Sequence, residues 1–180
     1  MAPALFPSLL DATDWSQLAP AVQRMHGEGA MLEASGTAQV DGDTHLLARL
    51  LRRVLSLPEP GADQAIALTI ERNGQRETWT RRFAGGQMRS TLQPGGGMKL
   101  RERLGPVSLH FSLRRDGHAI DWQLRRVSVL GLPLPRALCG HVLSRSGAHE
   151  GRYAFDIDTR LPGIGRLIAY RGWLDIDHVR

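Results

Sequence analysis

Hydrophobic and polar residues alternate along most of the chain after its first third. Ile66, Leu68 and Ile70 are apolar at every second position, and the segments 153–157 and 168–176 repeat this spacing. Because strand side chains point to opposite faces in turn, the pattern predicts strands with one buried face. Strands are expected over 64–72, 75–83, 87–93, 98–104, 107–115, 118–129, 141–149, 151–160 and 166–177, and more weakly over 32–40.

A sheet of so many strands must curl or pair its edges, since exposed strand edges recruit other chains. We therefore expect an α+β fold: a strongly curved antiparallel sheet or β-barrel of about nine to ten strands, covered by one amphipathic helix and a short N-terminal helical cap. The 180 residues fit a single domain, 1–180. Its expected parts are the cap (1–30), the covering helix (44–57) and the sheet (64–177).

Residues 44–57 form the clearest predicted helix, which Pro58 and Pro60 end. Its apolar residues follow the i, i+3, i+4 spacing of one stripe, and its arginines lie off that stripe. We expect the stripe to pack on the open side of the sheet with the arginines in solvent. The alternative is a basic amphipathic helix on a membrane surface. The stripe consists of Leu46, Leu47, Leu50, Leu51, Val54 and Leu55, and the arginines are Arg49, Arg52 and Arg53.

Cap signals set the boundaries of the N-terminal helices. Asp14 followed by Gln17 resembles a capping box, in which each side chain bonds a free backbone N–H of the other residue. Pro20 suits the first turn of a helix that runs to about His26, and Gly27 suits its end.

Two further features interrupt the alternation. In the strand 118–129 the apolar positions change from even to odd numbers near Arg125-Arg126, which predicts a β-bulge. The prolines of 130–135 exclude a central strand, so this apolar segment is expected to cross as a loop. A helical turn is expected at 136–138.

Composition narrows the class of protein. The apolar share is 42% and the formal net charge is +5, values typical of a folded domain that is modestly basic. Cys139 is the only cysteine, which favours a reducing compartment. The first 14 residues lack a basic region before their apolar stretch, and no apolar run reaches the length of a membrane span. We expect a cytoplasmic protein with no transmembrane segment.

Nucleic-acid binding is not indicated. Arginine supplies 22 of the 23 basic residues, with Lys99 as the single lysine, and several arginines occur as doublets. The two members of a doublet within a strand point to opposite faces, so they cannot form one basic patch. Aromatic residues, which single-stranded nucleic acids use for stacking, make up only 6% of the chain.

Two charged residues occupy apolar positions of the predicted sheet. Glu102 lies in the alternating row Met98, Leu100, Glu102, Leu104, and Arg81 lies between Trp79 and Phe83. An isolated buried charge is unfavourable, so each should pair with an opposite charge or bind a polar group of a ligand. We expect either a structural ion pair or two ligand anchors. The candidate ligand-binding residues are Arg81, Glu102, Trp79, Phe83, Trp122, Arg171 and Trp173.

The sequence predicts no catalytic residue, metal site or cofactor. The seven histidines and Cys139 do not form a recognisable metal-ligand spacing. His110 lies on the polar side of its strand and could act as a general base, because its pKa is ordinarily near neutrality. A solvated or hydrogen-bonded strand histidine is the simpler interpretation.

Several short segments occur in order across nearly the whole chain. They are Leu5-Phe6-Pro7, Leu18-Ala19-Pro20, Leu46-Leu47-Ala48-Arg49-Leu50-Leu51, Leu57-Pro58, Trp79-Thr80-Arg81-Arg82-Phe83, Arg89-Ser90-Thr91, Glu102-Arg103-Leu104-Gly105-Pro106, Leu130-Gly131-Leu132-Pro133-Leu134-Pro135 and Tyr170-Arg171-Gly172-Trp173-Leu174. Together they resemble the bacterial DUF4166 family, whose function is unknown. The family more often has an aromatic residue where this chain has Leu104, which changes packing. It also occurs behind saccharopine-dehydrogenase-like NAD-binding modules, which implies a partner- or substrate-binding role.

Three functions remain as hypotheses. The first is binding of an apolar or amphipathic, lipid-like small molecule between the curved sheet and the helix, since a concave apolar surface with a few polar anchors is typical of a ligand site. The second is an accessory domain with a solid core that docks to a nucleotide-dependent, dehydrogenase-like protein. The third is an enzyme of unknown reaction that uses Glu102 or His110.

Overall fold

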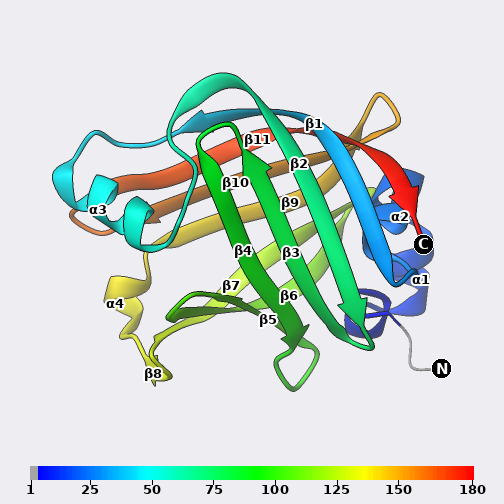
Figure 1. Cartoon of the computed structure of the whole chain (residues 1–180). Coiled ribbons are helices and arrows are strands. Elements are labelled where there is room, and N and C mark those ends of the chain that lie inside the picture. The colour runs from blue at the N-terminus through cyan, green and yellow to red at the C-terminus, as the bar shows by residue number, and fades with distance from the viewer. Residues whose placement is uncertain (1–3) are drawn as a thin grey trace.

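The computed structural model describes residues 4–180, and ten of its strands form a closed antiparallel barrel (Figure 1). An eleventh strand, β8, has only two residues and pairs with β7 alone. The strands are β1 (Met31–Asp41), β2 (Gly61–Asn73), β3 (Arg76–Phe83), β4 (Gly86–Pro94), β5 (Lys99–Leu104), β6 (Val107–Asp116), β7 (Ala119–Val129), β8 (Leu132–Pro133), β9 (His141–His149), β10 (Arg152–Leu161) and β11 (Gly165–Val179).

The barrel is built mainly from neighbours in the sequence. Each strand from β1 to β7 pairs with the next, as do β9, β10 and β11, while β11 pairs with β1 along its length. The last closure is the weakest: β7 and β9 pair only at Ile120 with Ser146 and at Asp121 with Arg145. Arg145 also forms ion pairs with Asp116 and Asp121, at 2.7 and 2.6 Å. Backbone pairing and ion pairs therefore hold the β7–β9 seam together at one position along its length.

The sequence predictions for the sheet are confirmed. Each predicted strand occurs with its ends within a few residues of the expected ones, and the sheet is an antiparallel β-barrel. The β-bulge also occurs where parity changes: His110 pairs with Arg126 and Phe111 with Leu124, so Arg125 is the extra residue. The α+β description with one covering helix is not confirmed, because the helices among residues 4–180 are short and the molecule is mainly β.

Two strands approach each other so closely that only glycine fits at two positions. Gly36 on β1 and Gly172 on β11 lie where the strands cross tightly, and a Cβ at either position would collide with a carbonyl oxygen of the other strand. Any larger residue would push β1 and β11 apart at the long ladder that joins the two ends of the chain.

The N-terminal segment is helical and lies across one end of the barrel (Figure 1). Residues 1–3 of the expected cap lie outside the described residues. The expected capping box is wrong, because Asp11 precedes α1 and accepts the hydrogen bond of Thr13 N, which places Asp14 inside the helix. Pro20 begins α2 and Gly27 ends it, as expected. The segment comprises the 3-10 helix η1 (Pro7–Leu9), α1 (Ala12–Ser16) and α2 (Pro20–His26).

The helix α3 (Leu46–Val54) lies at the opposite end of the barrel, and the predicted orientation of its stripe is wrong in part: Leu51 and Leu55 are half-buried against the barrel, whereas the other four residues of the stripe are exposed. Arg52 is only 2% exposed and donates from Nη1 to the carbonyl oxygens of Asp43 and Leu167, each at 3.0 Å. With Arg52 turned inward, Leu46 is 79% exposed and Leu50 56%. The arginine therefore fixes which side of the helix faces the protein.

A second short helix, α4 (Arg136–Cys139), lies at the same end as α3 and forms where a helical turn was expected. It follows the proline-rich segment 130–135, which turns back on β7: β8 pairs with the end of β7, and Leu134 N donates to the carbonyl oxygen of Val127. The expectation of a loop that crosses the sheet is therefore wrong for this segment. No helix among residues 4–180 is long and apolar enough to span a bilayer.

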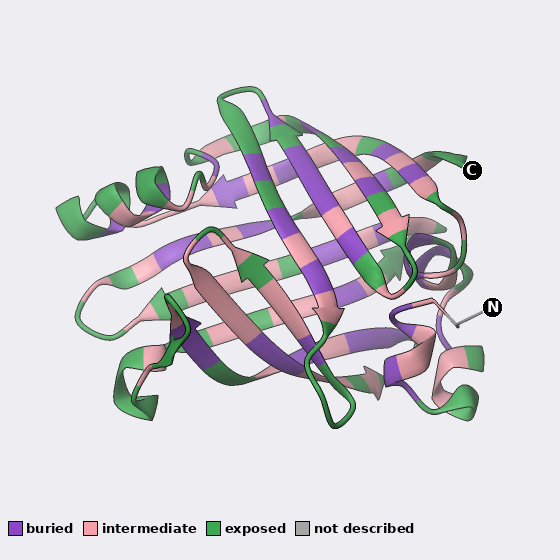
Figure 2. Ribbon diagram, turned by 60° about the horizontal axis from the view of Figure 1, so that its bottom comes forward, coloured by how far each residue is buried: buried purple, intermediate pink, exposed green. Residues whose placement is uncertain are grey.

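Burial alternates along the strands, so the dry face of the sheet is the inside of the barrel (Figure 2). The fully buried residues include side chains from β2, β4, β5, β6 and β7 as well as from the cap, so the core is continuous from the cap into the barrel. Its largest fully buried apolar members are Leu5, Phe6, Met25, Leu32, Ile70, Leu92, Leu100, Phe111, Ile120 and Leu174.

A buried ion pair joins the cap to the barrel wall. Arg72 and Glu77 face each other on β2 and β3, with Nε and Oε1 3.1 Å apart and both side chains almost fully buried. Arg72 also donates to the carbonyl oxygens of Met25 at 2.6 Å and Gly29 at 3.4 Å, beside the C-terminal end of α2. The second oxygen of Glu77 accepts from Trp79 Nε1 at 2.7 Å. This pair anchors α2 on the barrel.

His26 should make the stability of the cap depend on pH. Its ring is fully buried, 3.9 Å from the ring of Phe6, and its Nδ1 has no hydrogen-bond partner among residues 4–180. Burial, with a smaller effect of Arg72, holds the pKa of His26 well below its ordinary value. The unfolded chain therefore binds a proton that the folded protein excludes, and stability should fall as pH drops below about 6.5, by up to about 1.4 kcal/mol per pH unit.

Denaturant unfolding at pH 7 and pH 5 tests this prediction. The His26→Phe variant should lose less stability between these pH values than the wild-type protein does. His178→Phe, at an exposed position of β11, is the matched control and should keep the wild-type pH dependence. Equal pH dependence of His26→Phe and the wild type would contradict the assignment.

Candidate functional site

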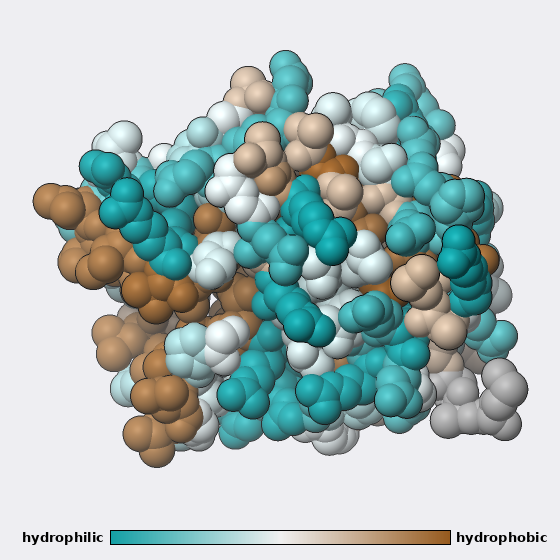
Figure 3. All heavy atoms as spheres, viewed as in Figure 1, coloured by the Kyte–Doolittle hydropathy of each residue, from teal (hydrophilic) through white to brown (hydrophobic). Residues whose placement is uncertain are grey.

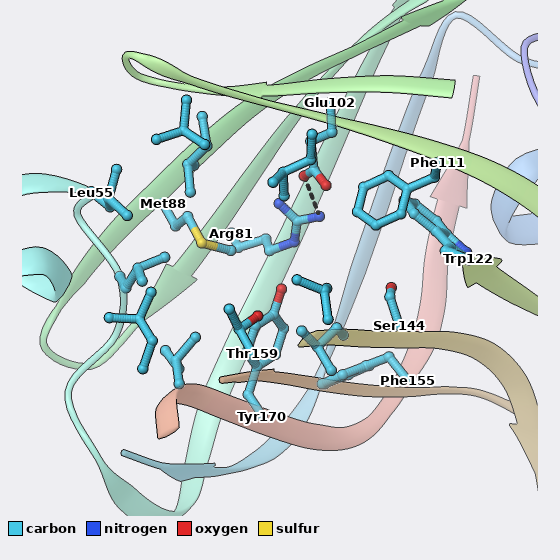
Figure 4. Close-up of a pocket in the computed structure, with 18 of the residues that line it drawn as sticks. Leu55, Arg81, Met88, Glu102, Phe111, Trp122, Ser144, Phe155, Thr159 and Tyr170 are labelled. Atoms are coloured by element: carbon cyan, nitrogen blue, oxygen red, sulfur yellow. Dashed lines mark ion pairs between the residues drawn. The ribbon is translucent and has the colours of Figure 1, made fainter. Parts of the chain in front are cut away.

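The barrel interior contains a cavity of about 300 Å³ that opens at the end opposite the cap. Barrel diameter grows with strand number, and eight strands already suffice to hold a small ligand. Ten strands therefore leave space that the inward side chains do not fill. Leu51 and Leu55, from α3 and its C-terminal end, line the cavity near its mouth together with Leu138 of α4. Phe111 and Trp122 line it deeper inside (Figure 4).

Arg81 and Glu102 bring opposite charges into this apolar interior. Arg81 lies on β3 and Glu102 on β5, and both side chains are largely buried, at 9% and 14% exposure. Nη2 of Arg81 and Oε1 of Glu102 are 3.7 Å apart, which makes an ion pair but exceeds the length of a hydrogen bond. Of the two expectations for these residues, the structure contains the ion pair (Figure 4).

The Arg81 guanidinium has more bonding partners in the protein than the Glu102 carboxylate has. Nη1 of Arg81 donates to Ser90 Oγ at 3.0 Å, and its guanidinium carbon lies 4.9 Å from the ring centre of Trp79. The Glu102 carboxylate accepts no hydrogen bond from any residue of 4–180. A carboxylate can accept several hydrogen bonds, so Glu102 keeps free acceptor capacity at the cavity surface.

Tyr170 adds a third polar group, and its hydroxyl points toward Arg81 (Figure 4). Burial raises the pKa of Tyr170, the Arg81 cation lowers it and the Glu102 anion raises it, with a net upward shift. The phenol therefore remains protonated and able to donate. The pattern predicted Tyr170 as a buried position, but its hydroxyl beside the ion pair was not predicted.

The hydroxyl and ring N–H groups at the inner end of the cavity bond to one another. Trp122 Nε1 donates to Ser146 Oγ at 3.2 Å, and that hydroxyl lies 2.8 Å from the Tyr153 hydroxyl. Tyr153 is in turn 3.4 Å from His26 Nε2, and burial raises the pKa of its hydroxyl. This chain of hydrogen bonds fixes the inner end of the cavity, whereas the Arg81–Glu102 pair retains unused bonding capacity.

Two of the four aromatic residues that were expected as walls lie at the cavity. Trp79 and Trp122 line the cavity and are almost fully buried. Phe83 is buried too, but its ring packs against Tyr170, with ring centres 6.3 Å apart, and it does not reach the cavity.

Arg171 and Trp173 lie on the outside of the barrel, so their placement at an interior site is wrong. Arg171 is 66% exposed and pairs with Asp41 at 3.6 Å. The Arg152 guanidinium lies 3.9 Å from the ring centre of Trp173. Parity explains both positions: Tyr170 points inward, so the odd-numbered residues of this stretch of β11 point outward.

His110 and Glu102 do not share a site. Glu102 pairs with Leu109 across β5 and β6, and His110 is the next residue along β6, so it faces the other side of the wall. Burial and, to a lesser extent, Arg126, Arg101 and Lys99 lower the pKa of His110. The enzyme hypothesis named Glu102 or His110, and the structure places these two candidates on opposite faces of the barrel wall. No cluster of three or more potential metal ligands occurs within the described part of the chain.

Comparison with known proteins identifies the family. A search of curated proteins finds no match. A family model described as "Domain of unknown function (DUF4166)" matches residues 18–174, which include the ion pair and almost the whole barrel. The chain therefore belongs to the DUF4166 family, as its motifs indicated.

Proposed function

We propose that this protein binds an apolar or amphipathic small molecule in the barrel cavity. The observation that carries the proposal is a cavity of about 300 Å³, at the lower end of the size of small-molecule sites, whose surface is mostly hydrocarbon around one ion pair. An apolar void of this kind is unfavourable when empty, because its lining loses the contacts that packed atoms would make. A hydrocarbon chain restores those contacts.

The ion pair supports a neutral polar head for this ligand. The formal charges of Arg81 and Glu102 cancel, so a charged head would meet no net opposite charge. A hydroxyl can donate to the free acceptor positions of Glu102 and can accept from Tyr170 or Arg81. A long-chain alcohol therefore matches the lining better than a fatty acid of equal length.

Native mass spectrometry tests the proposal. The wild-type protein, extracted mildly, should carry a lipid-like molecule or should bind added dodecanol one to one. Ser144 lines the cavity, so Ser144→Phe should fill part of it and weaken binding at least about tenfold.

Ser35→Phe is the matched control, because Ser35 is exposed on the outer face of β1. It should bind like the wild type, and circular dichroism should show both variants folded. A wild-type protein that neither carries nor takes up an amphipathic molecule would contradict the proposal.

A further inference from the structure

Six leucines stand in solvent around the mouth of the cavity. We call them the apolar rim, and each is exposed by half or more of its surface. In Figure 3 apolar atoms gather at the same end of the molecule as α3 and α4 in Figure 1, with a recess between the two groups. The rim therefore borders the opening of the cavity. It consists of Leu46, Leu47 and Leu50 on α3, and Leu130, Leu132 and Leu138 near β8 and α4.

The orientation of these leucines is built into the fold. Arg52 holds α3 by two hydrogen bonds to carbonyl oxygens at the barrel end, and Ala48 on the same side is fully buried. Turning the helix to hide its leucines would break both bonds and leave the carbonyl oxygens of Asp43 and Leu167 without that partner. Several large apolar side chains exposed together at one end of a protein are typical of an interaction site.

The charged residues beside the apolar rim indicate what kind of surface it would contact. The two segments that carry the rim, 44–57 and 130–140, contain four arginines and no acidic residue. Arg52 is buried, whereas Arg49, Arg53 and Arg136 are exposed beside the leucines. Leucines flanked by exposed arginines on a short amphipathic helix match the boundary between acyl chains and anionic headgroups.

We propose that the apolar rim docks the barrel on an anionic lipid bilayer, with the cavity mouth facing the membrane. The leucines of α3 and α4 enter the acyl boundary, and the three exposed arginines contact lipid phosphates. Docking through the apolar rim requires no ligand in the cavity, so this proposal does not depend on the proposed function.

Vesicle flotation with the full chain tests docking. The protein should bind vesicles that contain a third phosphatidylglycerol more tightly than pure phosphatidylcholine vesicles, by about fivefold for each arginine near the surface, and high salt should reduce the difference. Leu47→Ser/Leu50→Ser should weaken binding to the anionic vesicles about tenfold or more.

Met98→Ser/Val179→Ser is the matched control, because it removes two exposed apolar side chains at the capped end and should bind like the wild type. Ser144→Phe, whose rim is intact, should also bind normally even if it loses its ligand. Absence of vesicle binding, or equal binding by the leucine variant, would overturn the proposal. A wild-type dimer that Leu47→Ser/Leu50→Ser dissociates, with no vesicle binding, would instead assign the rim to a second copy of this chain.

Discussion

Replacing Arg72 with methionine should lower the free energy of unfolding by about 3–5 kcal/mol, the usual consequence of leaving one charge of a buried pair alone. Glu77 would keep only Trp79 Nε1 as a partner in a position that is closed to water. Burial already raises the pKa of Glu77 and Arg72 opposes that shift, so removing Arg72 should raise this pKa further. The carbonyl oxygens of Met25 and Gly29 would also lose their donor.

Chemical denaturation measures this loss. Arg76→Met, four residues further along and exposed, is the matched control and should change stability by less than about 0.5 kcal/mol. The double variant Arg72→Met/Glu77→Met should recover much of the loss, because it removes the buried carboxylate as well. Loss of less than about 1 kcal/mol in Arg72→Met would contradict the role of the pair as the anchor of the cap.

Glu102→Gln should reverse the ligand preference of the cavity. Without the carboxylate, the Arg81 guanidinium keeps Ser90 and the face of Trp79 but has no counter-charge. A fatty-acid carboxylate entering the cavity would supply that charge through charge-assisted hydrogen bonds, which contribute about 1.5–3 kcal/mol. Binding of dodecanoate relative to dodecanol should therefore rise about tenfold to a hundredfold, measured by calorimetry or native mass spectrometry.

Two further variants make this experiment specific. Glu71→Gln changes an exposed glutamate on β2 and should leave the preference unchanged. The double variant Arg81→Gln/Glu102→Gln contains neither charge and should again favour dodecanol. If Glu102→Gln bound both ligands in the wild-type ratio, the ion pair would not be the polar anchor.

The strands were predictable because strand periodicity is local. Alternation in each segment, such as 64–72, gives its two faces without reference to other strands, so the ranges and the bulge near Arg125 agreed with the structure. The same parity placed Arg81 and Glu102 on the inner face. The two side chains can then meet because the sheet curves and brings the inner faces of β3 and β5 close together.

The orientation of α3 was not predictable in this way. Periodicity shows that a helix has an apolar stripe, but it cannot show whether that stripe faces the protein. The decisive contact is that of Arg52 with the carbonyl oxygen of Leu167, 115 residues away. Likewise, the chemistry of Arg171 and Trp173 suggests a ligand site, but the alternation around Tyr170 places both residues on the outside.

The seam between β7 and β9 sets how far the cavity can widen. The two strands pair at Ile120 with Ser146 and at Asp121 with Arg145, and no further β7–β9 pair follows toward the mouth. Separating β7 from β9 toward the mouth breaks no backbone hydrogen bond between them. The barrel wall should therefore open more easily at this seam than between two strands that pair along their length. The largest ligand that the protein accepts should therefore depend more on how far β7 and β9 can separate than on the volume of the cavity in this structure.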